Sequence, residues 1–335
     1  MVITVAGQFC VDLVPRLSSA RVEPGKLFDI GPLDIRLGGC VANTGLALRD
    51  LGADVELQAM IGDDPLGELA VKLLRAGGQV SARLTALPGV ATSYTIVLEP
   101  GGADRTLWNH VGANAQFDNA ELVGDLLHLG YPPLIPAVLA DGGAPLLSLF
   151  ERARAAGMTT SLDFAFVDPE SWLGTLDWPG LLGVMMAVTD VASPSVDDLR
   201  SMLGIEQPGS LDLADALCRD LIAAGAAVAM VTAGEHGLAL RAAPAARLAS
   251  GGRVLAALGP SWADAALTLP SIATHLVTST GAGDAATAGL LCGLAEGLGP
   301  EASGRLAAAT AAAVMSGRRP TPEVIAGLAP GLVRS

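Results

Sequence analysis

The chain has 335 residues, 51% of them hydrophobic and only 4% aromatic, and its formal net charge is -14 at pH 7. This length suits one large α/β domain or two ordinary ones, and the apolar content is ample for a sizeable core. Neither nucleic acid nor an anionic membrane surface is expected as a partner, because both require a basic footprint. An anionic small molecule would have to be held locally, by backbone N–H groups or a few Lys and Arg side chains.

The cysteines, the histidines and the N-terminal segment carry no signal for a disulfide framework, a metal site or export. The cysteines Cys10, Cys40, Cys218 and Cys292 form no C-x-x-C pair, and the histidines His110, His128, His236 and His275 show no metal-ligand spacing. We therefore expect no disulfide framework or zinc site. The N-terminus lacks a basic signal-peptide segment, and no apolar run reaches the roughly 18 residues of a membrane span. These features favour a cytoplasmic protein.

The N-terminal third predicts strands, two helices and a hairpin. Asp64 followed by Pro65 is typical of a helix start, with Asp64 as the N-cap. The Gly101-Gly102 pair indicates the turn of a hairpin. The predicted elements are strands at 2–6 and 55–61, helices at about 41–51 and 65–76, and hairpin strands at 93–98 and 105–109.

From about residue 120 onward, short apolar runs alternate with helical segments. The expected strands are 126–130, 159–163, 190–192 and 228–232, and the expected helices are 137–156, 196–203, 211–224, 283–297, 301–316 and 321–328. Such alternation predicts βαβ units and a parallel sheet. No fixed-period repeat or low-complexity tail occurs, which favours one α/β domain with a small β excursion near the N-terminus.

The segment 278–284, Thr-Ser-Thr-Gly-Ala-Gly-Asp, is the most informative motif. It follows an apolar run at 275–277, expected to be a strand, and opens a long apolar helix. A Gly-Ala-Gly turn at a helix start leaves backbone N–H groups unpaired, and such a nest suits a phosphate or a developing anion. Asp284, the last residue of the motif, could take the proton from an attacking hydroxyl while the nest holds the phosphoryl oxygens.

Two other interpretations of this motif are open. The turn could be a tight strand-to-helix connection capped by Asp284, without chemistry. The pattern Gly281-x-Gly283-x-x-Ala286 also satisfies the dinucleotide-binding fingerprint. That fingerprint normally lies in the first βα unit of its domain, however, and an Asp inside the turn would repel a pyrophosphate.

Two N-terminal features could hold a hydroxylated ligand. Gly38-Gly39 precede Asn43 at the start of a predicted helix, and paired glycines allow close approach while an Asn amide both donates and accepts. Asp12 lies in an apolar stretch after the first strand, where its carboxylate is either a turn cap or an acceptor for two vicinal hydroxyls. Taken alone, each feature also has an ordinary structural explanation.

The turn Thr232-Ala233-Gly234-Glu235-His236-Gly237 follows another buried strand. Its glycines permit close approach of the backbone to a nucleotide at the carboxyl end of that strand, although an ordinary β-turn has the same composition. No Gly-x-x-x-x-Gly-Lys-Ser/Thr and no Gly-x-Ser-x-Gly occurs, which excludes a P-loop kinase and removes the usual α/β-hydrolase signal.

Taken in order, five elements of the chain resemble the ribokinase-like (PfkB) family of carbohydrate and nucleoside kinases. These elements are the first strand leading to Asp12, Gly38-Gly39-x-x-x-Asn43, Gly62-Asp63-Asp64-x-x-Gly67, Thr232-x-Gly234-x-x-Gly237 and Gly281-Ala282-Gly283-Asp284. They keep the order and spacing of the family, and the resemblance covers essentially the whole chain. It implies a Rossmann-type α/β sandwich with a mainly parallel sheet, a single kinase domain over 1–335, and a small discontinuous β lid from about 10–37 and 89–112.

The resemblance also implies roles for individual residues. Asp284 would be the general base, and Gly281, Ala282 and Gly283 would form the anion hole. The positions that would hold the sugar hydroxyls are Asp12, Gly38, Gly39 and Asn43, and the nucleotide-side turn would contain Thr232, Gly234 and Gly237.

The chain departs from the family pattern at three places. Thr278 stands where the family commonly has an Asp that helps to bind a monovalent cation, so we expect no dependence on K⁺. The Asn-x-x-Glu that organises Mg²⁺ corresponds to Ser195-Val196-Asp197-Asp198, in which Asp198 keeps the carboxylate and is the candidate metal ligand. Cys40 stands where ribokinases carry Lys, which argues against ribose.

The expected activity is transfer of the γ-phosphoryl group of ATP, with Mg²⁺, to a hydroxyl of a small sugar or sugar-like acceptor. A nucleoside (adenosine-like) kinase is the alternative, and a dinucleotide-binding enzyme or a non-catalytic binding module is more remote. A nucleoside would need an apolar slot for its base, for which the aromatic candidates are Phe9, Phe28, Tyr94 and Trp108. A homodimer through the lid is the expected assembly.

Overall fold

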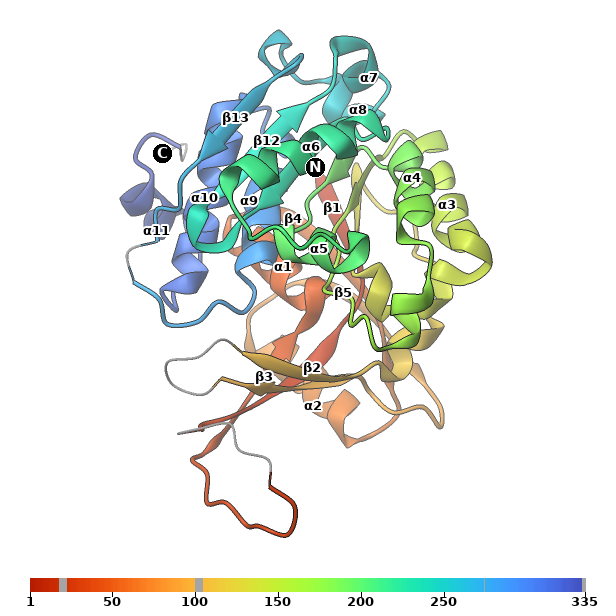
Figure 1. Cartoon of the computed structure of the whole chain (residues 1–335), viewed down its shortest axis with the longest axis vertical. Coiled ribbons are helices and arrows are strands. Elements are labelled where there is room, and N and C mark those ends of the chain that lie inside the picture. Colours follow the sequence, from red (N-terminus) through yellow and green to blue (C-terminus); the bar gives the residue numbers. More distant parts are fainter. Residues whose placement is uncertain (18–22, 100–104, 274, 333–335) are drawn as a thin grey trace.

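A nine-stranded sheet forms the centre of the molecule in the computed structural model, which describes residues 1–17, 23–99, 105–273 and 275–332 (Figure 1). From edge to edge its strands are β13 (Ala266–Leu269), β12 (Leu238–Ala242), β11 (Val228–Thr232), β10 (Val191–Ala192), β9 (Thr159–Leu162), β8 (Leu126–Gly130), β1 (Val2–Gly7), β4 (Asp54–Gly62) and β5 (Ser81–Leu87). Seven of these strands, from β11 to β5, run parallel, and β12 and β13 continue the sheet in antiparallel pairing. The prediction of a mainly parallel α/β sheet is therefore confirmed.

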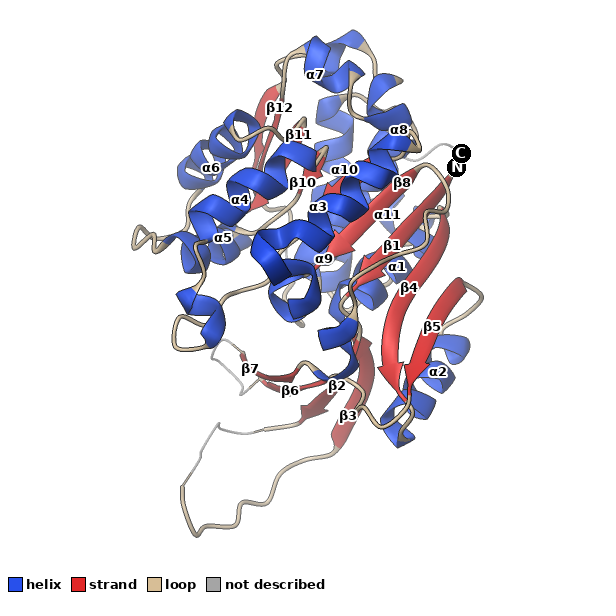
Figure 2. Cartoon of the chain, turned by 90° about the vertical axis from the view of Figure 1, so that its right-hand side faces the viewer, coloured by secondary structure: helices blue, strands red, loops and turns tan. Residues whose placement is uncertain are grey.

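A second sheet of four strands lies at one end of the molecule (Figures 1 and 2). In spatial order its strands are β3 (Leu33–Gly38), β2 (Cys10–Pro15), β6 (Tyr94–Leu98) and β7 (Thr106–His110). The pair β2–β6 is parallel, while β2–β3 and β6–β7 are antiparallel. The predicted hairpin strands thus form, and the Gly101-Gly102 turn lies outside the described residues.

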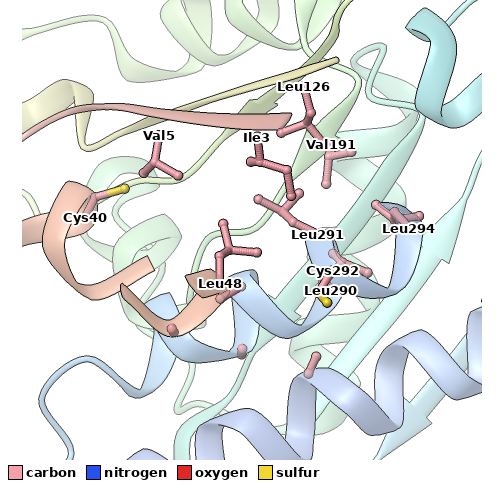
Figure 3. Packing of buried hydrophobic residues seen from close by; sticks show 14 of the residues in the cluster. Ile3, Val5, Cys40, Leu48, Leu126, Val191, Leu290, Leu291, Cys292 and Leu294 are labelled. Atoms are coloured by element: carbon pink, nitrogen blue, oxygen red, sulfur yellow. The ribbon is translucent and has the colours of Figure 1, made fainter. Parts of the chain in front are cut away.

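Helices cover both faces of the large sheet (Figure 2). One face packs against α1 (Gly39–Asp50), α9 (Ala282–Ala295), α10 (Pro300–Met315) and α11 (Pro322–Leu328), with α2 (Pro65–Ala76), α7 (Ala245–Ala249) and α8 (Gly252–Ala256) in the same apolar cluster. The other face packs against α3 (Ala140–Ala155), α4 (Trp178–Val188), α5 (Val196–Leu203) and α6 (Leu211–Ala223). Figure 3 shows the first core, where Ile3 of β1 meets Leu48 of α1 and Leu291 of α9.

The predicted cap located the start of α2 correctly. Asp64 accepts a hydrogen bond from the N–H of Gly67 at 2.8 Å and Pro65 is the first residue of α2, as predicted.

The predicted strand at 275–277 is wrong. Val277 donates its N–H to the carbonyl of Met315 at 2.7 Å, at the end of α10, and Leu276 and Val277 are exposed. The reason is that β13 forms the edge of the sheet, so this run has no strand beside it. Strands β5, β12 and β13 and helix α4 were not predicted.

In the described part of the chain, we find no helix whose length and apolar character would let it cross a membrane.

Close contact between α9 and α10 fixes where α9 begins. A Cβ added to Gly289 would lie 2.7 Å from the Cα of Ala307, and one added to Gly293 would lie 2.7 Å from the Oγ of Ser303. Only glycine permits this approach of the two backbones. The packing holds the N-terminus of α9 at the carboxyl edge of the large sheet.

We predict that Gly289→Ala destabilises the protein, although alanine normally favours a helix. Overpacking typically costs about 1–3 kcal/mol, more than the roughly 0.5–1 kcal/mol gained from helix propensity. Gly183→Ala in α4 is the matched control, because a Cβ there meets no heavy atom within 4 Å. Urea unfolding should show opposite shifts in the two midpoints. Stabilisation by both substitutions would contradict the packing argument.

Candidate active site

The candidate site lies at the carboxyl edge of the large sheet. Strands β1, β8 and β9 end there at Gly7, Gly130 and Leu162. The small sheet adjoins this edge because β2 begins three residues after β1 ends. The crevice outside the carboxyl ends of the strands is where open α/β sheets bind ligands.

Asp284 occupies the first turn of α9 and is held by two donors from α1. Its Oδ2 accepts a hydrogen bond from Nδ2 of Asn43, and its Oδ1 accepts one from Oγ1 of Thr44, both at 3.0 Å. The carboxylate is buried, with only 3% of the residue exposed. Asn43 therefore contacts Asp284 directly, a contact that sequence reasoning did not foresee.

Burial raises the pKa of Asp284 above its usual range. Hydrogen bonds from Tyr131, Asn43 and Thr44 and the positive charge of Arg105 act in the opposite direction. A buried carboxylate with a raised pKa is more basic than an exposed one, and the donors fix its orientation. This combination is what proton abstraction from a hydroxyl requires.

The Gly281–Gly283 turn presents free backbone donors beside this carboxylate. Gly281 adopts the left-handed conformation (φ 78°, ψ 5°) and is the N-cap of α9. Within the described residues, the N–H groups of Gly281 and Gly283 have no acceptor, whereas that of Ala282 donates to the carbonyl of Ser279 at 3.3 Å. Two of the three expected anion-hole donors are thus available to a ligand.

Asp12 lies in the middle of β2, so the interpretation of it as a turn cap is wrong. A Cβ on Gly38 would lie 2.2 Å from its Oδ1, which means that the glycine makes room for this carboxylate. Gly39 (φ 84°) is required for a similar reason, since a Cβ there would lie 1.9 Å from Oε1 of Gln8. Both glycines are explained by contacts within the protein.

Burial raises the pKa of Asp12 from 3.8 to about 6, and the negative charge of Asp284 adds to the rise. The thiol of Cys10, which donates to Oδ1 at 3.2 Å, and the charges of Arg36 and Arg105 act in the opposite direction. Asp12, on the small sheet, and Asp284, on α9, therefore lie within electrostatic reach of each other.

Two further carboxylates, the buried Asp163 and the partly buried Asp198, lie beside Asp284. Asp198 closes a capping box at the start of α5, where its Oδ2 accepts from the N–H and the hydroxyl of Ser195 at 2.8 and 2.6 Å. Burial raises the pKa of Asp198 to about 6. Asp163, just after β9, was missed as a site candidate; burial, with the charges of Asp284 and Asp198, raises its pKa well above the usual range.

A hard cation bound between these carboxylates would stabilise their negative charges. The described residues contain no set of three His, Cys, Asp or Glu side chains arranged to hold a metal by themselves. Mg²⁺ usually takes only one or two carboxylates, together with water and phosphate oxygens. Asp198 and Asp163 fit that smaller requirement, because no basic side chain is among the chief influences on the pKa of either.

The turn at 232–237 follows β11 as predicted, and Thr232 pairs with Ser195 in an isolated bridge. Gly237 (φ 115°) is required by the fold, since a Cβ there would lie 2.0 Å from the carbonyl oxygen of Leu269. A Cβ added to Gly234 (φ 56°), by contrast, would meet no heavy atom within 4 Å. Close approach of a ligand is therefore possible at Gly234, whereas Gly237 serves the packing of β12 against β13.

Cys40 is fully buried beneath the site. Its Sγ lies 3.3 Å from Nε2 of His128, whose Nδ1 is 2.8 Å from the hydroxyl of Ser161. Burial lowers the pKa of His128 to about 3, so the ring is neutral, in keeping with the structural role expected for it. A lysine at position 40 would have no room in this packing.

A carboxylate does lie next to Thr278, contrary to the premise of the K⁺ argument. Oε1 of Glu99 accepts hydrogen bonds from the hydroxyls of Thr278 at 3.3 Å and Thr280 at 3.2 Å. The sequence argument considered position 278 alone and could not see a charge supplied from the small sheet. The expectation that K⁺ is not needed therefore loses its physical basis.

Comparison with protein-family models matches residues 3–322 to the pfkB family carbohydrate kinase model. This chain belongs to the PfkB family of carbohydrate kinases. It is thus a sugar or nucleoside kinase of the ribokinase type, a phosphotransferase, and ATP as co-substrate is supported by this membership.

Among curated relatives, this PfkB-family chain is similar to a fructokinase of Rhizobium leguminosarum bv. trifolii, with 26% identity over 87% of the chain and 79% of the relative. It is also similar to a 1-phosphofructokinase of Rhodobacter capsulatus, with 28% identity over 98% of the chain and 91% of the relative. The two relatives differ in the acceptor that their names imply.

Solved structures agree on the fold. A nucleoside kinase of Methanocaldococcus jannaschii superimposes with a TM-score of 0.71 at 19% identity, covering 98% of this chain and 97% of the other. A ribokinase of Arabidopsis thaliana, complexed with ribose and ATP, gives 0.69 at 18% identity, covering 99% of both chains. At these identities the likeness establishes the ribokinase-like fold and leaves the acceptor open.

We predict that Thr44→Val moves the acid limb of the kcat/KM profile to higher pH by roughly one to two pH units. Removing a donor from Asp284 raises its folded pKa further, so the base is protonated, and activity is lost, at a higher pH. A hydrogen bond to a charged group is typically worth about 1.5–3 kcal/mol, and 1.36 kcal/mol corresponds to one pKa unit. Thr310→Val, a buried threonine in α10 whose hydroxyl bonds Leu306, is the control and should leave the profile unchanged. An unmoved acid limb in Thr44→Val would show that this donor does not tune Asp284.

Proposed function

We propose that this chain transfers the γ-phosphoryl group of ATP to a hydroxyl of a small sugar or sugar-like acceptor, with Asp284 as the general base. The observation that carries the proposal is the adjacency of a buried, donor-held carboxylate to the free N–H groups of Gly281 and Gly283. The carboxylate takes the proton of the acceptor hydroxyl while the N–H groups stabilise the phosphoryl oxygens. The hydroxyl oxygen forms its bond to phosphorus as the bond to the leaving ADP breaks.

Other residues take supporting roles in this proposal. Asp12 accepts hydrogen bonds from acceptor hydroxyls, beside the Gly38-Gly39 segment, and Asn43 orients the base. The open turn at Gly234, after Thr232, lies on the nucleotide side. Mg²⁺, which Asp198 with Asp163 would hold, offsets phosphate charge during transfer.

The small sheet favours a sugar over a nucleoside. Successive side chains of a strand point to opposite faces. The register places Asp12, Thr95 and Asn109 in one row, and Leu13, Ile96 and Trp108 in the neighbouring row on the opposite face. Trp108 therefore points away from the face that carries Asp12.

The other aromatic candidates lie no better for a nucleobase. Tyr94 shares the face of Trp108, where its ring centroid lies 5.2 Å from that of His110. Phe9, expected as a slot residue, is fully buried in the core and cannot contact a base. Phe28, in the loop before β3, is the one candidate among these four aromatic residues that the observations above do not exclude.

We predict that Asp284→Asn lowers kcat by about 10²–10⁴-fold, the usual worth of general-base help, while binding of ATP is retained. ADP release should be measured with free sugars, sugar phosphates, keto-acids and nucleosides as acceptors. Asp212→Asn, an exposed aspartate in the first turn of α6, is the matched control and should keep full activity. A folded Asp284→Asn variant with more than a third of the original kcat would refute the base assignment. Preferential turnover of nucleosides would refute the acceptor class.

We also propose that the outer face of the small sheet joins two copies of the chain. An apolar row crosses all four strands there, formed by Ile35, Leu13, Ile96 and Trp108. Trp108 is 49% exposed and Ile35 38% exposed, and they lie on β7 and β3, the two edge strands of this sheet. Self-association of such a face would bury both copies of this row in one symmetric contact.

Ile35→Asp should convert a particle of twice the chain mass into one of the chain mass, as measured by light scattering after size exclusion. A charge in an apolar symmetric contact appears twice and is desolvated in both copies. Trp172→Asp, at an exposed aromatic residue in the segment before α4, is the control and should leave the mass unchanged. A wild-type protein that elutes at the chain mass would rule this interface out.

A further inference from the structure

Three consecutive side chains before the Gly281–Gly283 turn are bound by the small sheet. The hydroxyls of Thr278 and Thr280 donate to Oε1 of Glu99 at 3.3 and 3.2 Å, and Nη1 of Arg105 donates to Oγ of Ser279. Glu99 directly follows β6 and Arg105 directly precedes β7. The two arms of one hairpin therefore contact the same loop.

The 278–280 loop has few other ties. Its backbone bonds to other elements are from the N–H of Thr278 to the carbonyl of Met315 and from the N–H of Ala282, the first residue of α9, to the carbonyl of Ser279, both at 3.3 Å; within the described residues Thr280 has none. The N–H of Thr280 bonds the side chain of Thr278, inside the loop itself. The side-chain contacts from the hairpin are thus a main restraint on the residues that lead into Gly281.

We propose that Glu99 and Arg105 are positioning residues, which hold the 278–280 loop so that the N–H groups of Gly281 and Gly283 point at the transferred phosphoryl group. The proposal rests on the function proposed above, since it assigns that loop to the anion hole. Hydrogen bonds to charged groups are stronger and geometrically stricter than neutral ones, which suits them to this task. Glu99 acts through Thr278 and Thr280, and Arg105 through Ser279.

The same contacts connect two parts of the site. Asp12, on β2 of the small sheet, faces the acceptor side, and β2 pairs with β6, which ends next to Glu99. Burial raises the pKa of both Asp12 and Asp284, and the charge of Arg105 opposes this rise in each. A movement of the small sheet on the acceptor would therefore be transmitted to the loop through the hairpin.

The first test is amide hydrogen exchange on the full-length protein without ligands. Glu99→Gln keeps the size of the side chain but removes the charge that accepts both hydroxyls. Exchange of a peptide covering 278–284 should rise at least about tenfold, which corresponds to about 1.4 kcal/mol in opening free energy. Asp34→Asn, at an exposed acidic residue on β3 whose side chain has no hydrogen bond or ion pair in the described structure, is the control and should match wild type.

Removal of the donors provides an independent variant. Thr278→Val with Thr280→Val should raise exchange of the same peptide as much as Glu99→Gln, and adding Glu99→Gln should change it little further, since coupled residues are not additive. Additive effects, or a Glu99→Gln peptide within twofold of wild type, would overturn the proposal. If Glu99→Gln also loosens β1 and β8, the threonine variant decides.

The second test separates positioning from nucleotide binding. Calorimetry with Mg-ADP, with and without fluoroaluminate as a phosphoryl mimic, should show that Glu99→Gln binds Mg-ADP within threefold of wild type. Its affinity for the fluoroaluminate complex should fall at least about tenfold. Equal weakening of both ligands would overturn the positioning role. If wild type binds neither ligand, the proposed function fails, and the exchange experiment still decides whether the hairpin holds the loop.

Discussion

The site depends on the contact in which α1 and α9 meet through Asp284. Burying a carboxylate away from water is costly unless donors replace the lost hydration. Here Asn43 and Thr44, adjacent residues of one helix, each bind a different carboxylate oxygen. This pairing fixes the relative placement of the two helices. It therefore also fixes the distance between Asp284 and the small sheet, which α1 directly follows in the chain.

The charges around this contact are unbalanced in a way that suits phosphoryl transfer. The buried Asp163 and the partly buried Asp198 lie within electrostatic reach of Asp284, and loss of contact with water raises the pKa of all three. Such a cluster favours a positive charge that arrives with the nucleotide, and the Mg²⁺ proposed above would supply it. Arg105, which directly precedes β7 of the small sheet, brings a positive charge that acts on Asp284 from the acceptor side.

Sequence reasoning succeeded where local chemistry decides the structure. Helix α2 begins where Asp64 was predicted to cap it, because a cap acts on residues only three positions away. The predicted range 196–203 also matches α5, where the structure shows Ser195 as the cap. Sequence reasoning failed for contacts made by distant segments. Thr44 reaches Asp284 across 240 positions and Glu99 reaches Thr280 across 181, and no local pattern marks either residue. The antiparallel strands β12 and β13 were missed for a related reason: β12 forms by pairing with β11, and β13 by pairing with β12, and neither pairing is marked in the local sequence.

The glycines show most clearly what a motif can and cannot say about ligands. Gly38, Gly39 and Gly237 were all interpreted as making room for a ligand, yet Asp12, Gln8 and Leu269 fill that room. Gly283 is different: it has no positive φ, and a Cβ there would meet no protein atom within 4 Å. Nothing in the fold requires glycine at this exposed first-turn position, where it costs helix stability. A ligand that approaches the backbone at Gly283 would supply the missing reason, and the free N–H beside Asp284 is where a phosphoryl group would make that approach.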